Sequence, residues 1–319
     1  MPRALILGAT GQDGQFLADF LLGKEYEVLG TSRSKTAYSN NPLSLRRPIF
    51  RTVDITSIKE LGLVLADFKP DEIYNLAGES SVSRSFQHPT EAIESNVLGV
   101  VNLLTTIMQT PGLKDVRIFQ ASSAEMFGSQ NTQLNESSQF RPVSPYAISK
   151  LAAHKISDTY RRIHGIWISC GILFNHESEI RPEHFVFQKI ITSAVSISKG
   201  QAHQLTLGNL EISRDWGYSR DYVEAMWKLL QAETPDDYVV ATGKKHSLRD
   251  LIGLTFATLG INSEIEPLVN LDPSLSRPTD VQSTWGDPSK IRDKLGWKAR
   301  TSFEELVELL IQHQLRQNS

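Results

Sequence analysis

Residues 4–17 read Ala-Leu-Ile-Leu-Gly-Ala-Thr-Gly-Gln-Asp-Gly-Gln-Phe-Leu, and this stretch decides the fold. Four apolar residues predict a short strand, the pattern Gly-x-x-Gly-x-x-Gly follows at positions 8–14, and an amphipathic helical pattern comes next. A strand, a glycine turn and a helix in this order are typical of dinucleotide binding. Glycines let the backbone approach a pyrophosphate, and free N–H groups at the helix start attract its charge. The stretch therefore indicates nucleotide binding rather than an ordinary tight turn.

Strand and helix patterns continue to alternate along the first half of the chain. This alternation predicts an α/β fold with a Rossmann-type, doubly wound parallel sheet. At 319 residues the chain exceeds one ordinary single-core domain, so we also expect a smaller C-terminal α/β lobe that binds substrate. The expected bounds are 1–174 for the nucleotide-binding domain, with 213–245 returning to it, and 175–212 plus 246–319 for the lobe.

Composition narrows the class of partner. The net charge of −3 gives no reason to expect nucleic acid or an anionic membrane as the main partner. Cys170 is the single cysteine, so no intrachain disulfide can form. Because it lies in an apolar run, we expect it in the core. No apolar stretch approaches the ~20 residues that span a bilayer, and the chain enters its first strand at once. A cytoplasmic location is expected.

Two stretches predict acid–base chemistry. Ser122-Ser123-Ala124-Glu125 ends the strand expected at 116–121, and Tyr146 and Lys150 lie one turn apart on the helix expected at 144–164. An ammonium near a phenol favours the phenolate, so we expect Lys150 to lower the pKa of Tyr146 and make it a base. Ser123 can hydrogen-bond the same substrate oxygen, and Glu125 adds a second proton carrier. The combination indicates redox plus elimination chemistry.

The segment after the second strand indicates which dinucleotide binds. NAD-binding sites carry an acidic residue there, whereas this chain has Ser32-Arg33-Ser34. Arg33 suits the 2′-phosphate of NADP, so NADP is favoured over NAD. Asp54, after the strand expected at 49–53, can accept from the adenine amino group. Helix capping through Thr56 or Ser57 is the competing explanation for the polar residues there.

Six stretches together resemble one family. They are residues 8–14, Ser144-Pro145-Tyr146, residues 171–178, Arg214-Asp215-Trp216-Gly217-Tyr218, residues 221–227 and Arg277-Pro278-Thr279-Asp280-Val281. The chain resembles the extended short-chain dehydrogenase/reductases and, among them, the GDP-mannose 4,6-dehydratases. The glycine and Tyr-Lys motifs mark only the superfamily. Phe-Asn-His-Glu-Ser at 174–178 and the Arg-Asp-Trp-Gly segment are much more particular to the dehydratases.

The resemblance implies an NADP-dependent hydro-lyase that converts GDP-mannose to GDP-4-keto-6-deoxymannose and regenerates its cofactor. It implies that Tyr146 takes the 4-hydroxyl proton, Ser123 polarises that oxygen and Lys150 holds the nicotinamide ribose. Glu125 would remove the C5 proton and then protonate the departing 6-hydroxyl. His176 and Glu177 do not suggest a metal site, because no companion ligands cluster with them.

The resemblance and the motif positions together give the expected binding residues. For the cofactor they are Gly8, Thr10, Gly11, Gln12, Asp13, Gly14, Arg33, Asp54, Ile55, Leu76, Ala77, Gly78, Ser80, Tyr146, Lys150, His176 and Arg181. For the GDP-sugar they are Ser85, Asn175, Lys189, Arg214 and Arg277.

Several positions depart from the family pattern. Only Arg33 remains of the paired arginines that the family usually has after the second strand. Ser123 stands where threonine is usual, and Val186-Phe187-Gln188-Lys189 replaces Val-Thr-Arg-Lys. Arg84 is bulkier than expected beside the sugar. A heptose or an amino sugar on GDP therefore stays open as an alternative substrate.

Two further alternatives remain. One is a reductase or epimerase of nucleotide sugars, although Glu125 argues for dehydration because a reductase needs no C5 base. The other is a catalytically idle NADP-binding regulator, against which Ser123, Tyr146 and Lys150 argue. The helices expected at 90–109 and 144–164 commonly pair subunits in this superfamily, so we expect a homodimer or homotetramer.

Overall fold

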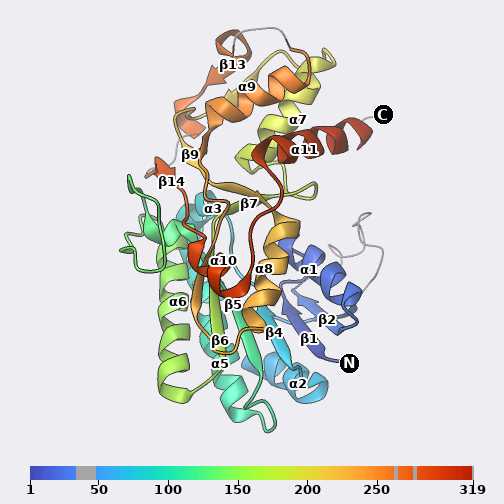
Figure 1. The fold of residues 1–319 in the computed structure, drawn as a ribbon, viewed down its shortest axis with the longest axis vertical. Helices are drawn as coiled ribbons and strands as arrows, with labels where there is room; N and C mark the ends of the chain where they lie inside the picture. Colours follow the sequence, from blue (N-terminus) through green and yellow to red (C-terminus); the bar gives the residue numbers. More distant parts are fainter. Residues whose placement is uncertain (34–47, 262–264, 276–278, 318–319) are drawn as a thin grey trace.

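The computed structural model describes residues 1–33, 48–261, 265–275 and 279–317. A parallel sheet of seven strands fills the lower half of the view in Figure 1, and a smaller group of helices lies above it. The strand order is β11-β6-β5-β4-β1-β2-β3, so the chain winds outward from β1 in both directions. This is the doubly wound α/β arrangement that the sequence predicts. Ligands bind such sheets where the winding reverses, at the carboxyl ends of the strands.

The elements that build this half follow the predicted alternation. The strands are β1 (Arg3–Leu7), β2 (Glu27–Ser32), β3 (Ile49–Thr52), β4 (Glu72–Asn75), β5 (Arg117–Ser123), β6 (Ile168–Leu173) and β11 (Asp237–Val240). The principal helices are α1 (Gln12–Gly23), α2 (Ile58–Phe68), α5 (Gly99–Gln109), α6 (Pro145–His164), α8 (Ser219–Leu230) and α10 (Ser289–Leu295).

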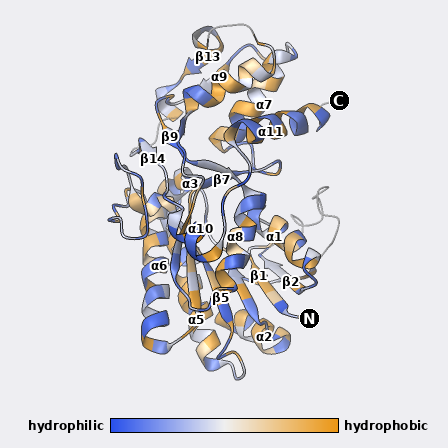
Figure 2. Ribbon diagram, in the orientation of Figure 1, coloured by the Kyte–Doolittle hydropathy of each residue, from blue (hydrophilic) through white to orange (hydrophobic). Residues whose placement is uncertain are grey.

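Alternate residues of each strand supply the two cores of the sheet, because successive side chains point to opposite faces. Ala4 and Ile6 of β1 pack in one core with α1 and α8. Leu5 and Leu7 pack in the other core with α2, α5 and α6. The flanking helices show mixed blue and orange bands in Figure 2, as amphipathic helices do. Both faces of the sheet are covered, which leaves its strand ends as the place for ligands.

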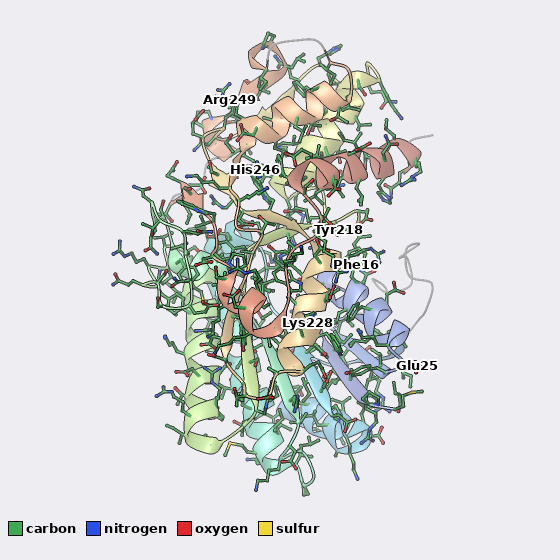
Figure 3. All side chains as sticks on the ribbon, in the orientation of Figure 1. Phe16, Glu25, Tyr218, Lys228, His246 and Arg249 are labelled. Carbon is green, nitrogen blue, oxygen red and sulfur yellow. The ribbon has the colours of Figure 1, made fainter. Side chains whose placement is uncertain are left out.

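The upper group of elements has a core of its own. It is built from α7 (Val186–Ser198), α9 (Leu248–Thr258), α11 (Phe303–Gln317), β8 (Leu205–Leu207) and β13 (Val269–Leu271). Trp216 and Tyr218 of β10 (Trp216–Tyr218) also belong to this core. In Figure 3, Tyr218 lies below His246 and Arg249 and above Lys228. The β10 strand therefore reaches the level where the upper core meets the sheet.

Asp215 connects three segments at this junction. Its buried carboxylate accepts from the backbone N–H groups of Thr242 (2.9 Å), Gly243 (2.9 Å) and Gly286 (3.3 Å). The Thr242 hydroxyl donates to it as well, at 2.6 Å. A carboxylate can accept several such bonds at once, so Asp215 fixes the backbone beside Arg214.

The helix expected at 90–109 contains a π turn. It runs as α4 (Pro89–Ile93), a π-helical turn at Glu94–Leu98 and then α5. Within the turn, the buried Asn96 side chain donates to Ser149 Oγ at 2.9 Å and to the Glu79 carbonyl at 3.3 Å. Single π turns often occur at functional sites. This one ties α6 to the segment that follows β4.

Within the described ranges, no helix has both the length and the apolar character to cross a bilayer.

Candidate active site

A cavity of about 480 Å³ lies beyond the carboxyl ends of β4, β5 and β6. Ser123, Glu125, Tyr146 and Lys150 all line it from the side of the sheet. Residues of α7 and of the segment after β8 line it from the upper group of elements, among them Lys189 and Asn209. The cavity therefore lies between the two cores, where residues distant in sequence converge.

The end of β5 presents Ser123 and Glu125. Ser123 is the last residue of the strand and caps a short 3₁₀ helix, Ala124–Phe127, by accepting from the Glu125 backbone N–H at 3.2 Å. A serine favours such a capping position because its hydroxyl satisfies a free N–H group. Arg214 brings Nη2 to 3.9 Å from Glu125 Oε1, and both side chains are largely buried. The Glu125 carboxylate thus shares the cavity with Tyr146 and has a cation beside it.

The start of α6 fixes Tyr146. Ser144 caps the helix by accepting from the Ala147 N–H at 3.1 Å, and Pro145 occupies the first helical position. Both choices are typical of helix starts. The Tyr146 N–H donates to Ser85 Oγ at 3.1 Å, and the Ser85 hydroxyl donates to the Val82 carbonyl. Ser85 is fully buried and lies outside the cavity lining, and its contacts hold the start of α6. Its contact with the sugar stays a prediction.

The expectation that Lys150 lowers the pKa of Tyr146 is wrong. Burial raises the pKa of the Tyr146 phenol to about 12, and the polar side chain of Ser123 opposes this shift only in part. Burial also lowers the pKa of Lys150 to about 8. The Lys150 ammonium donates to the Ala121 carbonyl at 2.7 Å, so it holds the end of β5. Removal from water destabilises the phenolate more than the nearby cations stabilise it.

The glycines of the turn after β1 stand where two backbone segments approach each other closely. Gly8 has a φ of +87°, and a Cβ there would lie 2.8 Å from the Ala77 nitrogen. A Cβ on Gly14 would lie 2.5 Å from the Gly8 carbonyl oxygen. Gly11 precedes α1 and offers no side-chain cap, so the first N–H groups of the helix face outward for an anion. These features fit a bound pyrophosphate.

An ion pair fastens this turn to the segment after β6. His176 Nε2 lies 2.9 Å from Asp13 Oδ2, and His176 Nδ1 lies 2.7 Å from the Phe174 carbonyl. Both ring nitrogens face acceptors, so the ring is best held as an imidazolium. The opposing charge of Asp13 raises the pKa of His176 against the effect of burial, and His176 in turn lowers the pKa of Asp13. Gln12 adds two bonds, to the His176 carbonyl (3.1 Å) and from the Ser178 hydroxyl (2.7 Å).

This ion pair predicts a window of pH in which it stabilises the protein. Because the pKa of His176 is raised, its positive charge stabilises the fold fully below about pH 6.5. This stabilisation is lost as the pH rises through the folded-state pKa of His176. Because the pKa of Asp13 is lowered, its negative charge stabilises the fold fully above about pH 3.8. This stabilisation is lost as the pH falls through the folded-state pKa of Asp13. We expect His176→Asn to lower the free energy of unfolding by about 1.5–3 kcal/mol between those limits and by less above them. Urea denaturation from pH 4 to pH 9 measures this, and a deficit that is constant with pH contradicts it.

The comparisons with known proteins agree on one family. The family described as GDP-mannose 4,6 dehydratase matches residues 5–310. GDP-mannose 4,6 dehydratase 2 of Arabidopsis thaliana is 40% identical over 98% of this chain and 86% of its own length. The chain belongs to the GDP-mannose 4,6-dehydratase family. The GDP-mannose 4,6-dehydratase of Vibrio cholerae is 35% identical, over 98% of this chain and 94% of its own.

Solved structures place the fold of this GDP-mannose 4,6-dehydratase family member in a wider group. A Thermus thermophilus UDP-glucose 4-epimerase in complex with NAD superposes with a TM-score of 0.86 and 24% identity, over 98% of this chain and 99% of the other. RMD from Pseudomonas aeruginosa, complexed with NADPH, superposes with a TM-score of 0.81 and 21% identity, over 99% and 100%. At these identities the likeness concerns the fold alone.

Most of the expected site residues of this family member come together in the cavity. Those that line it are Asp13, Leu76, Ala77, Gly78, Ser80, Ser123, Glu125, Tyr146, Lys150, Asn175, His176, Arg181, Lys189 and Arg214. Those outside its lining are Gly8, Thr10, Gly11, Gln12, Gly14, Arg33, Asp54, Ile55 and Ser85. Arg277 lies outside the described residues.

The expected residues outside the lining follow β1, β2 and β3, with the exception of Ser85. Arg33 is exposed directly after β2. Asp54 follows β3, and its Oδ1 accepts from both the Thr56 N–H and the Thr56 hydroxyl. Ser57 caps α2 by accepting from the Glu60 N–H, so local capping accounts for much of the polarity there. The Ile55 side chain is buried in the core beneath α2 and α5.

Sequence reasoning missed several residues that the dehydratase fold brings to the cavity. Glu79, Glu177, Asn209 and Asp280 line it. Glu177 carried a signal, since it stands in the stretch 174–178 that marks the family. Asn209 and Glu79 lie in unremarkable loops, and only the fold brings them in. Arg84, which we expected beside the sugar, is half-exposed and is held by Glu79 and Glu91 outside the lining.

Proposed function

We propose that the protein is a nucleotide-sugar 4,6-dehydratase that converts GDP-mannose to GDP-4-keto-6-deoxymannose, with hydride recycled within each turnover. The observation that carries this proposal is Glu125 lining the same cavity as Tyr146 and Ser123, with Arg214 beside it. Oxidation at C4 needs one base, and elimination across C5 and C6 needs a second proton carrier. A cavity with a phenol and a separate carboxylate supplies both.

The residues have distinct roles in the proposed reaction. Tyr146 takes the proton of the sugar 4-hydroxyl as C4 loses hydride, and Ser123 donates a hydrogen bond to the developing carbonyl oxygen. The resulting ketone acidifies the C5–H bond, and Glu125 removes that proton. The protonated Glu125 then gives its proton to the 6-hydroxyl, which leaves as water. C5 regains a proton when hydride returns to C6, which completes the 6-deoxy product. Tyr146 and Glu125 thus act on adjacent parts of one hexose.

The cofactor that fits the glycine turn is a nicotinamide dinucleotide, and we propose NADP. When bound, the oxidised nicotinamide accepts hydride from C4, returns it at C6 and adds a positive charge beside Tyr146. Asp13 and His176 would lie near the pyrophosphate, and Lys150 would hold the nicotinamide ribose. Arg33 supports NADP over NAD, because an exposed guanidinium after β2 can bind the 2′-phosphate by paired hydrogen bonds.

Arg33 carries a testable prediction about the cofactor. We expect Arg33→Ala to weaken NADP binding by about 10–100-fold, the loss of one or two charge-assisted hydrogen bonds, with NAD binding little changed. Fluorescence titration of both dinucleotides measures the two dissociation constants. Arg162→Ala, at an exposed arginine on α6, is the matched control. Equal weakening of NADP and NAD by Arg33→Ala contradicts the assignment.

The upper side of the cavity supports a GDP-sugar substrate. Arg214 and Lys189 bring cations to it, and Asn175 adds an amide. The start of α7 also borders the cavity at Phe185 and Val186, and its cap has no side-chain hydrogen bond. A helix start and two cations suit a diphosphate. The arrangement supports a nucleoside diphosphate, and the choice of GDP rests on the family to which the chain belongs.

The deciding experiment uses mass spectrometry and needs no added cofactor. Purified protein is incubated with GDP-mannose and, separately, with GDP-mannoheptose. We expect loss of one water and a 4-keto product from GDP-mannose. Dehydration of the heptose compound alone would select the alternative GDP-sugar. A product without loss of water would select a reductase or epimerase, and no reaction with either compound would remove the proposal.

We also propose that the protein assembles as a homodimer or homotetramer. Ile148 and Ile163 of α6 are 51% and 70% exposed, and Met108 of α5 is 51% exposed. Large apolar residues on neighbouring helices suit burial against a second subunit. Sedimentation analysis tests this, and a monomer at micromolar concentration contradicts it.

A further inference from the structure

A buried polar cluster lies between α6 and the edge of the sheet that carries β5, β6 and β11. His154 Nδ1 lies 3.0 Å from Ser122 Oγ, and His154 Nε2 lies 3.5 Å from Asp237 Oδ2. Asp237 Oδ1 in turn lies 2.8 Å from Arg161 Nη1. His154 is 2% exposed and Ser122 is 3% exposed. The chain of contacts therefore leads from an arginine on α6 to the residue that precedes Ser123.

The cluster contains the residue types of a metal site, because ligand atoms of His154, Cys170 and Asp237 lie within 4.8 Å of one another. Two observations favour a hydrogen-bond network instead. Arg161 already supplies the cation that compensates Asp237. Burial raises the pKa of the Cys170 thiol well above its usual range, which disfavours the thiolate that a metal needs.

The surroundings of His154 define its tautomer. The carboxylate of Asp237 faces Nε2, so the proton belongs on Nε2 and Nδ1 accepts from the Ser122 hydroxyl. Burial lowers the pKa of His154 despite Asp237, which keeps the ring neutral near pH 7. A neutral, oriented imidazole can hold Ser122 in one rotamer.

The same face of α6 holds two successive residues of β5. Lys150 Nζ donates to the Ala121 carbonyl at 2.7 Å, and His154 accepts from Ser122. Tyr146, one turn before Lys150, lines the same cavity as Ser123. Residues 146, 150 and 154 are spaced one helical turn apart, so they form a single row. The row aligns the strand that presents Ser123 with the helix that presents Tyr146.

We propose that His154 is a positioning residue, which acts through Ser122 to hold the end of β5 so that Ser123 and Glu125 face Tyr146 correctly. This inference rests on the proposed function, because it gives those three residues their roles. A displacement of about 1 Å in such a group can lower the rate by about 100-fold. A network that fixes the strand end therefore contributes to turnover without touching substrate.

The test compares two variants that differ in polarity at one position. His154→Phe keeps a ring against Phe140, which packs edge-on to His154 at 5.4 Å, and removes the acceptor. We expect it to lower kcat for GDP-mannose by about 10–100-fold, with KM changed by less than about twofold. His154→Asn returns an acceptor near the position of Nδ1, and it should restore most of kcat.

Ser122→Ala completes a double-mutant cycle. It should lower kcat as His154→Phe does, and the double variant should be no slower than either single variant, because both remove one contact. Near-normal kcat in His154→Phe overturns the proposal. So does a loss of kcat that His154→Asn does not restore, or full additivity in the double variant.

Hydrogen exchange separates failure of this inference from failure of the proposed function. If the wild type dehydrates no GDP-sugar, the proposed function fails, and the exchange of residues 117–127 then decides about His154. We expect faster exchange of that segment in His154→Phe and wild-type exchange in His154→Asn. Identical exchange in the wild type and His154→Phe overturns the positioning role in that case.

Discussion

Replacing Glu125 by glutamine is expected to lower dehydration of GDP-mannose by about 10²–10⁴-fold, the usual contribution of a general base. Glutamine keeps the shape of the side chain and cannot take the C5 proton. Oxidation at C4 does not need Glu125, so the reduced nicotinamide should accumulate once substrate is added. Stopped-flow absorbance of the reduced cofactor and mass spectrometry of the product measure the two steps separately.

The control for Glu125→Gln is a second carboxylate in the same cavity. Glu79 lines it as well, but the Arg84 guanidinium holds one of its oxygens at 2.8 Å, and its other oxygen accepts from the Ser80 and Ser81 N–H groups. Glu79→Gln removes the same charge and should cost much less turnover. Near-normal turnover by Glu125→Gln would refute the assigned base, and equal losses in the two variants would indicate a general effect of charge.

Replacing Tyr146 by phenylalanine is expected to remove C4 oxidation itself, again by about 10²–10⁴-fold. The ring still fills its buried position, so cofactor affinity and thermal stability should remain close to wild type. No reduced nicotinamide should accumulate, in contrast to Glu125→Gln. Single-turnover absorbance therefore distinguishes the two variants by the step at which each one stops.

The raised pKa of Tyr146 adds a second expectation to this prediction. Burial raises that pKa to about 12, so the phenol holds its proton at neutral pH in the protein without ligands. We expect the positive charge of the bound oxidised nicotinamide to lower it and make the phenol a base. Ser123→Ala removes the hydroxyl that opposes this rise in pKa, so it should lower the rate of C4 oxidation, but by less than Tyr146→Phe does. Rapid C4 oxidation by Tyr146→Phe would assign the base to another group.

Local patterns in the sequence were sufficient for the sheet and for placing Tyr146 and Lys150 on one face of a helix. The strand and glycine turn at 4–14 predict the first βα unit, because only glycine fits where a Cβ at Gly8 or Gly14 would meet backbone. Tyr146 and Lys150 are paired by helix geometry alone. The residue types at these positions are fixed by short-range sterics and spacing, which a sequence displays directly.

Burial and long-range contacts were not available from the same patterns. The spacing of Tyr146 and Lys150 suggests a lowered phenol pKa, yet the buried environment raises it. The hydroxyl of Ser85 accepts from the Tyr146 N–H, a contact between residues 61 positions apart that no sequence pattern indicates. Burial decides the first case, and a contact between residues far apart in the chain decides the second.

By itself, the sequence determined the doubly wound fold, the nucleotide turn and the membership of one family, because these depend on local spacing. Only the tertiary structure decided that Arg214 lies beside Glu125, that Asp13 meets His176 and that His154 reaches Ser122. The first two pairs are 89 and 163 residues apart in the chain and the third is 32 apart, counted from their residue numbers. Such contacts depend on which distant segments the fold brings together, and no short stretch of sequence shows those pairings.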